Sequence, residues 1–270
     1  MSTQHMPQIG KLGFGVAGPL ASRLFPAQQT EQLIEKAIEC GVSFFDTGPS
    51  YGGGEGERRL GAVLAQNNRK KLFISTKAGV TEHGKRDFAP ASLYDSLRRS
   101  LDRMQLEYVD GLFLHGLTRS DFSDQLLQIL HQMKSEGLVR RLGVVGQKRV
   151  MDFIIEGYPQ FELLMLQLSP SLWAKNIEIA AAAKLAGRTV VGIEMLAHTR
   201  RSLRLSSHPG DIWHMLRYLR RGGTYSKEDA LSVLRAALVN PYVDLVLTSS
   251  TKIKHVEDWQ SCLDECSASS

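Results

Sequence analysis

Residues 42–61 read VSFFDTGPSYGGGEGERRLG, and they pass from an apolar strand pattern through a short loop into a helical pattern. Asp46 ends the apolar run, Tyr51 lies in the loop, and three consecutive glycines follow it. A plain connecting loop requires neither an acid nor a phenol. A strand joined to a helix in this way is the repeating unit of α/β folds, so we expect the rest of the chain to repeat it.

Apolar runs of strand length recur eight times, with helical patterns between them. They are KLGFGVA (11–17), VSFFD (42–46), KLFISTK (71–77), YVDGLFLHG (108–116), VRRLGVVG (139–146), FELLMLQLS (161–169), TVVGIEML (189–196) and VDLVLTS (243–249). These runs are more often apolar on both faces than alternating, as a parallel sheet covered by helices requires. Eight strand–helix units in 270 residues match the size of a (β/α)8 barrel. We therefore predict an α/β fold, a (β/α)8 TIM barrel, with residues 1–270 as a single domain.

Helix patterns support this alternation. Residues 30–41 form one of them, with Thr30 in place to be the N-cap and Gly41 to follow the last turn. Residues 91–104 carry apolar side chains at 93, 97, 101 and 104, the spacing of one buried helix face. Residues 228–240 repeat that spacing.

A doubly wound parallel sheet is the competing architecture, and a glycine-rich phosphate turn after its first strand is typical of it. Residues 13–18, GFGVAG, match the G-x-G-x-x-G pattern. The residues that follow, PLASRLFP, contain two prolines and do not open a helix. Because the pattern lacks its strand–turn–helix context, the barrel is favoured.

The composition, with 43% hydrophobic and 23% charged residues, is that of a folded protein with a substantial core. Cys40, Cys262 and Cys266 leave an odd thiol and have no metal-ligand spacing, which favours a reducing, cytoplasmic location. The N-terminus shows no basic-then-apolar leader, and no run of about 18 apolar residues occurs. We therefore expect a soluble protein without a membrane partner.

The net charge is +5, and arginines are concentrated in residues 197–226, the longest stretch without strand character. The cluster consists of Arg200, Arg201, Arg204, Arg217, Arg220 and Arg221. One interpretation is a solvated surface with a helix at 211–221; another is an anion site for a phosphate or a carboxylate. Nucleic acid is the least favoured partner, because no aromatic residues alternate with the arginines and no recognition motif accompanies them.

Three ionisable residues fall where the second, third and fourth strands end: Asp46, Lys77 and His115. Tyr51 lies in the loop after the second strand. Functional groups of a (β/α)8 barrel gather at the carboxyl ends of its strands. Each residue alone has a structural explanation: a turn aspartate, a half-buried aromatic, a lysine that extends to solvent and a hydrogen-bonded histidine. Their convergence on one rim favours an active site.

This combination suits proton transfer to a carbonyl oxygen. The phenol of a free tyrosine has a pKa of about 10, too high for ready proton exchange near neutrality. An ammonium beside a phenol favours the phenolate, and an aspartate keeps that ammonium charged and oriented. A histidine can hydrogen-bond the substrate oxygen. Because these residues provide no hydride, the site needs a nicotinamide cofactor.

The chain resembles the aldo-keto reductase superfamily, as a bacterial-type member, over nearly its whole length. FFDTGPSYGGGEGERRLG is similar to the Asp–Tyr signature of that family, ISTKAG to its lysine strand and LFLHG to its histidine strand. ALVNPYVDLVLTSSTKIKHVED is similar to its closing strand and cofactor-binding helix. The resemblance implies an NADP-dependent oxidoreductase that reduces an aldehyde or ketone to an alcohol, with NADPH preferred over NADH. It also implies a monomer or weak homo-oligomer.

The resemblance assigns a role to each residue of the rim. Tyr51 would be the proton donor, Lys77 and its partner Asp46 would make the phenol more acidic, and His115 would orient the carbonyl. Gln167 would hydrogen-bond the nicotinamide carboxamide. The further cofactor-binding candidates are Ser249, Ser250, Thr251, Lys254, Asp258 and Arg201. Arginines near Arg201 would alternatively bind an anionic substrate.

The sequence departs from the family pattern in two regions. Val145 and Gly146 stand where a Ser-Asn pair commonly holds the carboxamide, so one hydrogen bond of about 1 kcal/mol is expected to be missing. Residues 195–204, MLAHTRRSLR, lack the proline of the usual loop and are basic. Lys254 and His255 stand where an arginine most often binds the 2′-phosphate, and a lysine lacks bidentate geometry.

Two functions of other classes stay open. A lyase or isomerase on the same barrel would use Tyr51 and Lys77 for proton transfer without hydride, and Val145 is the feature that favours it. A cofactor-binding regulatory subunit, similar to the β-subunits of potassium channels, would turn over little. The complete set of four rim residues argues against this second alternative.

Overall fold

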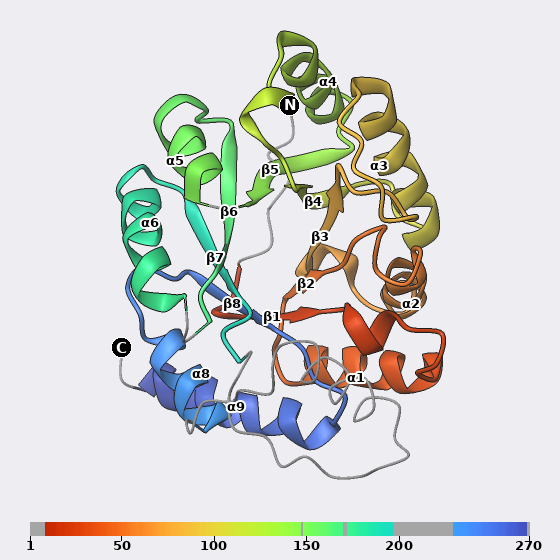
Figure 1. The fold of residues 1–270 in the computed structure, drawn as a ribbon. Coiled ribbons are helices and arrows are strands. Elements are labelled where there is room, and N and C mark those ends of the chain that lie inside the picture. The colour runs from red at the N-terminus through yellow and green to blue at the C-terminus, as the bar shows by residue number, and fades with distance from the viewer. Residues whose placement is uncertain (1–8, 147, 170–171, 197–228, 269–270) are drawn as a thin grey trace.

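Figure 1 shows the computed structural model of the protein, which describes residues 9–146, 148–169, 172–196 and 229–268. Eight parallel strands close into a barrel in which each strand pairs with the next and β8 pairs with β1. The strands are β1 (Leu12–Gly15), β2 (Phe44–Asp46), β3 (Phe73–Ala78), β4 (Val109–His115), β5 (Val139–Val145), β6 (Phe161–Gln167), β7 (Thr189–Ile193) and β8 (Leu245–Thr248). The predicted (β/α)8 TIM barrel is confirmed.

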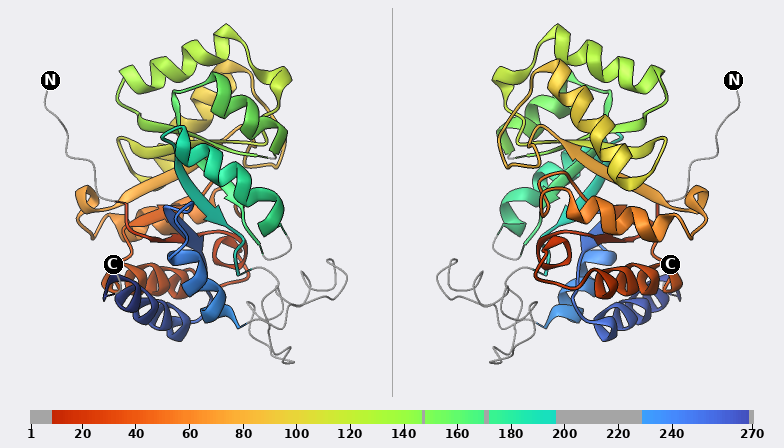
Figure 2. Two further views of the ribbon diagram at one scale, coloured as in Figure 1. Left: turned by 90° about the vertical axis from the view of Figure 1, so that its left-hand side faces the viewer. Right: turned by 90° about the vertical axis from the view of Figure 1, so that its right-hand side faces the viewer.

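Helices surround the barrel, and neighbours around the ring pack on one another, α9 returning onto α1 (Figures 1 and 2). The helices are α1 (Ala27–Glu39), α2 (Glu55–Leu64), α3 (Pro90–Met104), α4 (Asp124–Ser135), α5 (Lys148–Gly157), α6 (Trp173–Leu185), α8 (Ala230–Leu238) and α9 (Ile253–Ala268). Short 3-10 turns are η1 (Gly18–Ala21), η2 (Arg69–Lys71) and η3 (Arg119–Asp121). Because every strand runs in the same direction, all carboxyl ends meet at one rim.

Two apolar layers, one inside the barrel and one outside, hold the fold together. The interior is filled by Phe44, Phe73, Phe113, Leu163, Met165, Val191, Leu245 and Leu247. The rings of Phe44 and Phe73 stack with their centroids 4.9 Å apart. The larger layer lies between strands and helices. Burial on both faces explains the continuously apolar strand sequences, and the filled interior leaves the ends of the strands as the place for polar groups.

The predicted strands all overlap observed ones, and most extend beyond them at the ends. The helix expected at 91–104 is α3, and its predicted apolar face is buried. Gly41, with φ +81°, follows α1 as predicted. The prediction of Thr30 as an N-cap is wrong, because α1 begins three residues earlier at Ala27. The buried Thr30 hydroxyl instead donates to the carbonyl oxygen of Leu20 at 3.0 Å and ties α1 to η1.

The rejected glycine pattern at 13–18 spans the end of β1 and the start of η1, and no α-helix follows it directly. The helix expected at 228–240 is α8, where the Asp229 side chain accepts hydrogen bonds from the backbone of the first turn. The loop 197–226, its arginine cluster and the helix predicted at 211–221 lie outside the described residues.

The side chains of Cys40 and Cys262 are buried. Burial raises the pKa of the Cys40 thiol. Within the described segments, no helix is both long enough and apolar enough to cross a membrane.

Candidate active site

The strand ends bring three of the predicted site residues together. Asp46 is the last residue of β2 and His115 the last of β4, while Lys77 lies one residue before the end of β3. In the barrel register Asp46 is opposite Ser75, and Lys77 is opposite Phe113. Side chains alternate along a strand, so Lys77 shares the interior face with Phe73 of the barrel core, as Asp46 does with Phe44.

Asp46 and Lys77 form a buried ion pair, with only 2% and 3% of their surfaces exposed. Lys77 Nζ donates to Asp46 Oδ2 and, at 2.9 Å, to the carbonyl oxygen of Thr47. Burial lowers the pKa of Lys77, but Asp46 and Tyr51 raise it more, and the net pKa lies above its ordinary value. The amine is therefore held as an ammonium at the floor of the site.

Tyr51 is half-buried, and Lys77 Nζ lies 4.9 Å from the centroid of its ring. The loop that carries it is tight: the Tyr51 N–H donates to the Gly48 carbonyl at 3.0 Å. Glycine makes this turn possible, because Gly52 has φ +63° and a Cβ there would lie 1.8 Å from the carbonyl oxygen of Ala21. Only glycine fits this approach.

His115 lies beside the ion pair and is half-buried. Its Nδ1 atom is buried and has no hydrogen-bond partner among the residues that the structure describes. Burial, followed by the positive charge of Lys77, lowers the pKa of His115 below its ordinary value. The imidazole is therefore neutral at neutral pH, and a neutral imidazole has one N–H donor.

Two further residues support the ion pair and were not predicted from the sequence. Ser75 Oγ donates to Asp46 Oδ1 at 2.8 Å, and the Thr47 carbonyl accepts from Lys77. Ser75 stands two residues before Lys77, so strand alternation already placed both on one face. The pairing of Ser75 with Asp46 depends on the register between β2 and β3, which no local pattern specifies.

The second predicted group lies where β6 and β8 end. Gln167 is the last residue of β6, and its side chain is exposed. Ser249, Ser250 and Thr251 follow β8 and precede α9. The Ser250 hydroxyl is already engaged, since it accepts from the Lys252 N–H at 3.1 Å and lies 2.9 Å from His255 Nδ1.

Lys254 stands in the first turn of α9 with 83% of its side chain exposed, and its Nζ lies 3.9 Å from Asp258 Oδ1. The amino end of a 16-residue helix and a nearby ammonium attract anions. With the Ser249 and Thr251 hydroxyls, this donor set fits the phosphates of a nicotinamide nucleotide. Arg201, the other predicted member, lies outside the described residues.

Val145 ends β5 directly opposite His115 and packs against the apolar interior of the barrel. Its side chain therefore presents methyl groups, without a hydrogen-bond donor or acceptor, next to the imidazole. Val145, the residue that departs from the family pattern, thus lies at the rim beside His115.

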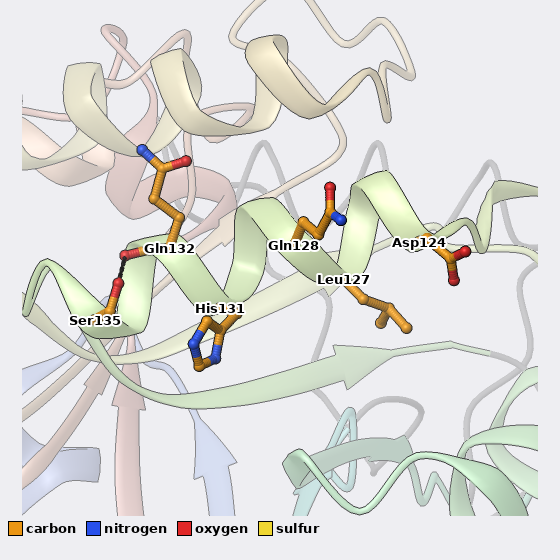
Figure 3. Close-up of a pocket in the computed structure, with 6 residues that line it drawn as sticks. All are labelled: Asp124, Leu127, Gln128, His131, Gln132 and Ser135. Atoms are coloured by element: carbon orange, nitrogen blue, oxygen red, sulfur yellow. Dashed lines mark hydrogen bonds between the residues drawn. The ribbon is translucent and has the colours of Figure 1, made fainter.

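A separate groove runs along α4 on the outside of the barrel (Figure 3). Its lining comes entirely from that helix: Asp124, Leu127, Gln128, His131, Gln132 and Ser135. No residue of the rim contributes to it, so it is not part of the candidate site.

The family model for the aldo/keto reductase family matches residues 11–263. Over 201 residues the chain is 30% identical to L-galactose dehydrogenase from Arabidopsis thaliana, a match covering 66% of this chain and 62% of that protein. The chain spans less than two thirds of the length of the curated relatives that it matches: 62% of this dehydrogenase and 51% of a probable aldo-keto reductase from Glycine max.

Solved structures share the fold. An aldo-keto reductase from Bacillus halodurans, in its holo form, superposes with a TM-score of 0.75 at 23% identity, covering 96% of this chain and 91% of that one. An aldo/keto reductase from Klebsiella pneumoniae, solved with NADP and acetate, gives a TM-score of 0.70 at 21% identity and covers 94% and 86%.

Proposed function

Because the chain belongs to the aldo/keto reductase family, we propose that it is an NADP-dependent enzyme that reduces a small aldehyde or ketone to an alcohol. The observation that carries this proposal is the buried Asp46–Lys77 pair beside the ring of Tyr51. We further infer that residues 1–270 act as one domain in the cytoplasm, as a monomer or weak homo-oligomer.

Tyr51 is the proton donor in this proposal. When the carbonyl is reduced, the phenolic proton passes to the carbonyl oxygen, and the phenolate that remains is stabilised by the ammonium of Lys77. Asp46 keeps this ammonium charged and fixed, because it accepts a hydrogen bond from Lys77 Nζ. The nicotinamide cofactor, when bound, supplies the hydride that Tyr51, Lys77 and Asp46 lack.

His115 orients the substrate. Its lowered pKa keeps the imidazole neutral, so it can donate one hydrogen bond to the carbonyl oxygen without adding a second positive charge beside Lys77. The donor thereby aligns the oxygen with the Tyr51 hydroxyl.

The cofactor is held by two groups of residues in this proposal. Gln167 binds the nicotinamide carboxamide from the end of β6. The nucleotide phosphates lie at the amino end of α9, against Ser249, Ser250, Thr251 and Lys254, with Asp258 near the adenine. Since the Ser250 hydroxyl already contacts the Lys252 N–H and His255 Nδ1, its contribution is to order the loop before α9. Arg201 is a further candidate for the phosphates or for an anionic substrate.

NADPH is favoured over NADH because Lys254 is exposed at the site of the 2′-phosphate and carries a positive charge. A lysine contacts a phosphate as a point charge, without the bidentate geometry of arginine. The preference is therefore expected to be smaller than an arginine would produce.

One observation favours a second candidate, a lyase or isomerase that transfers a proton without hydride. The apolar side chain of Val145 lies opposite His115, so the nicotinamide ring lacks a hydrogen bond there. Tyr51 and Lys77 would serve the proton transfer equally well.

Fluorescence titration of the purified protein with NADPH and with NADH tests the proposal. We expect both nucleotides to bind, NADPH more tightly, and a panel of aldehydes and ketones to oxidise the bound NADPH. Gln167→Ala should weaken binding without changing the fold. If neither nucleotide binds, the reductase is refuted and the proton-transfer alternative stands.

A further inference from the structure

Behind the rim, a second buried carboxylate joins three elements of the fold. Glu57 in α2 is fully buried. Its Oε1 accepts a hydrogen bond from Thr76 Oγ1 at 2.6 Å, and its Oε2 accepts from Arg103 Nε, also at 2.6 Å. Arg103 belongs to α3 and also donates to Ser100 at 3.2 Å. Glu57 thus connects α2 to both β3 and α3.

The contact on β3 is made immediately beside the catalytic lysine. Thr76 directly precedes Lys77, and alternation along the strand points Lys77 into the barrel and Thr76 outward, toward α2. The fully buried Thr76 hydroxyl is bonded to Glu57. A shift of Glu57 would therefore pull on the segment of β3 that carries Lys77.

The contacts on the other side reach the loop of Tyr51. The Gly56 N–H, in the first turn of α2, donates to the Tyr51 carbonyl at 3.3 Å. Gly54 has φ +85°, and a Cβ there would lie 2.6 Å from the Arg103 side chain. The arginine that pairs with Glu57 therefore also packs against the end of the Tyr51 loop.

We propose that Glu57 is a positioning residue that, through Thr76 and Arg103, sets the approach of Tyr51 to Lys77. This inference rests on the proposed function, in which Tyr51 donates the proton and Lys77 stabilises the phenolate. A buried ion pair adds little stability compared with apolar side chains of the same shape, so its use lies in specifying one geometry. Here that geometry joins the loop after β2 to the strand that carries the ammonium.

The test uses Thr76→Val, which removes the hydroxyl bonded to Glu57 and leaves the Glu57–Arg103 pair in place. We expect kcat for carbonyl reduction to fall between about tenfold and a hundredfold, because small misplacements of reacting groups carry losses of this size. The KM for NADPH should stay unchanged, and Thr76→Ser should restore kcat. Glu57→Gln, the second variant, should give a loss in the same direction.

Thr189→Val is the matched control. Thr189 stands at the amino end of β7 and accepts a hydrogen bond from Arg141 at 3.0 Å. Thr189→Val also removes a strand hydroxyl that is hydrogen-bonded to a charged side chain. Because Thr189 lies at the opposite end of the barrel from Tyr51, kcat should not change. Adding Thr76→Val to Tyr51→Phe should cause no further fall in kcat, because Thr76 affects kcat only by positioning the Tyr51 hydroxyl.

Hydrogen exchange of the peptide covering residues 48–56 gives a readout independent of turnover. We expect this peptide to exchange faster in Thr76→Val than in the wild type or in Thr189→Val. Unchanged exchange and unchanged kcat in Thr76→Val would overturn the positioning role even in an active enzyme. If the wild type reduces no carbonyl, the proposed function fails, while the exchange measurement still decides whether Glu57 holds the loop.

Discussion

The two ends of the barrel each bury a carboxylate against positive charge, and they do so differently. At the carboxyl ends, Asp46 pairs with Lys77. At the amino ends, Asp110 Oδ1 accepts a hydrogen bond from Arg140 at 3.0 Å, and Asp110 Oδ2 forms an ion pair with a guanidinium nitrogen of Arg69 at 2.7 Å. The backbone N–H of Ile74 also donates to Asp110 Oδ2 at 2.9 Å.

The cluster around Asp110 is built from groups that keep their charge near neutrality. The guanidinium groups of Arg69 and Arg140 lie 4.5 and 4.0 Å from the ring centroid of Tyr108, and arginine does not change its charge near neutrality. The lysine at the other end lies 4.9 Å from the centroid of a phenol ring, and burial, followed by the charge of that lysine, lowers the pKa of His115. A buried ion pair by itself is therefore consistent with a purely structural role. A titratable side chain beside it that can still form a hydrogen bond points to a catalytic role.

Tyr51→Phe removes the proposed proton donor at the carboxyl ends of the strands and should have the largest effect. Because positioned proton donors contribute about 10²- to 10⁴-fold to rates, kcat for carbonyl reduction should fall within that range. Nucleotide affinity, measured by fluorescence titration, should stay near the wild-type value. Equal turnover in the variant would refute the assignment of Tyr51.

Asp110→Asn removes the negative charge that pairs with Arg69 and Arg140, and it should lower the stability of the fold. It leaves two partly buried arginines without their counter-charge. Breaking a fully buried pair typically lowers the unfolding free energy by about 3–5 kcal/mol, so we expect a loss up to that size. Urea denaturation measures this loss, while kcat of the folded fraction should stay unchanged. A large loss of kcat without a loss of stability would contradict the division between the two ends.

The pH dependence of stability should report on His115, because its pKa is lower in the folded protein than in the unfolded chain. The unfolded chain then binds the proton first as the pH falls below about 6.5. The unfolding free energy should therefore decline below that pH, and this part of the decline should be absent in His115→Gln. Identical pH profiles for both proteins would show that folding does not lower the pKa of His115.

Val145→Ser should have the smallest effect. The new hydroxyl supplies a hydrogen bond of about 1 kcal/mol to the nicotinamide, which corresponds to about fivefold tighter binding. Val145→Ala, which removes methyl groups without adding a hydroxyl, is the control. Tighter binding by both variants would mean that space, and not hydrogen bonding, limits cofactor affinity.

The amino-acid sequence by itself determined the barrel and the polar residues that lie together at its rim. Eight two-sided apolar runs predict a parallel sheet, and the polar residues at the ends of the second, third and fourth runs mark the rim. Asp46, Lys77 and His115 could be identified in this way because a strand end is a local feature. The turn around Gly52 was also readable, since the glycines follow Tyr51 directly.

Only the tertiary structure decided how these residues are supported. In the sequence Glu57 stands among other charges of a helix, and its full burial depends on α2 meeting both β3 and α3. Likewise, Ser75 bonds Asp46 because of the register between two strands about 30 residues apart. Periodicity identifies the face on which a side chain lies, whereas its partner is chosen by packing between distant segments, which no local pattern contains.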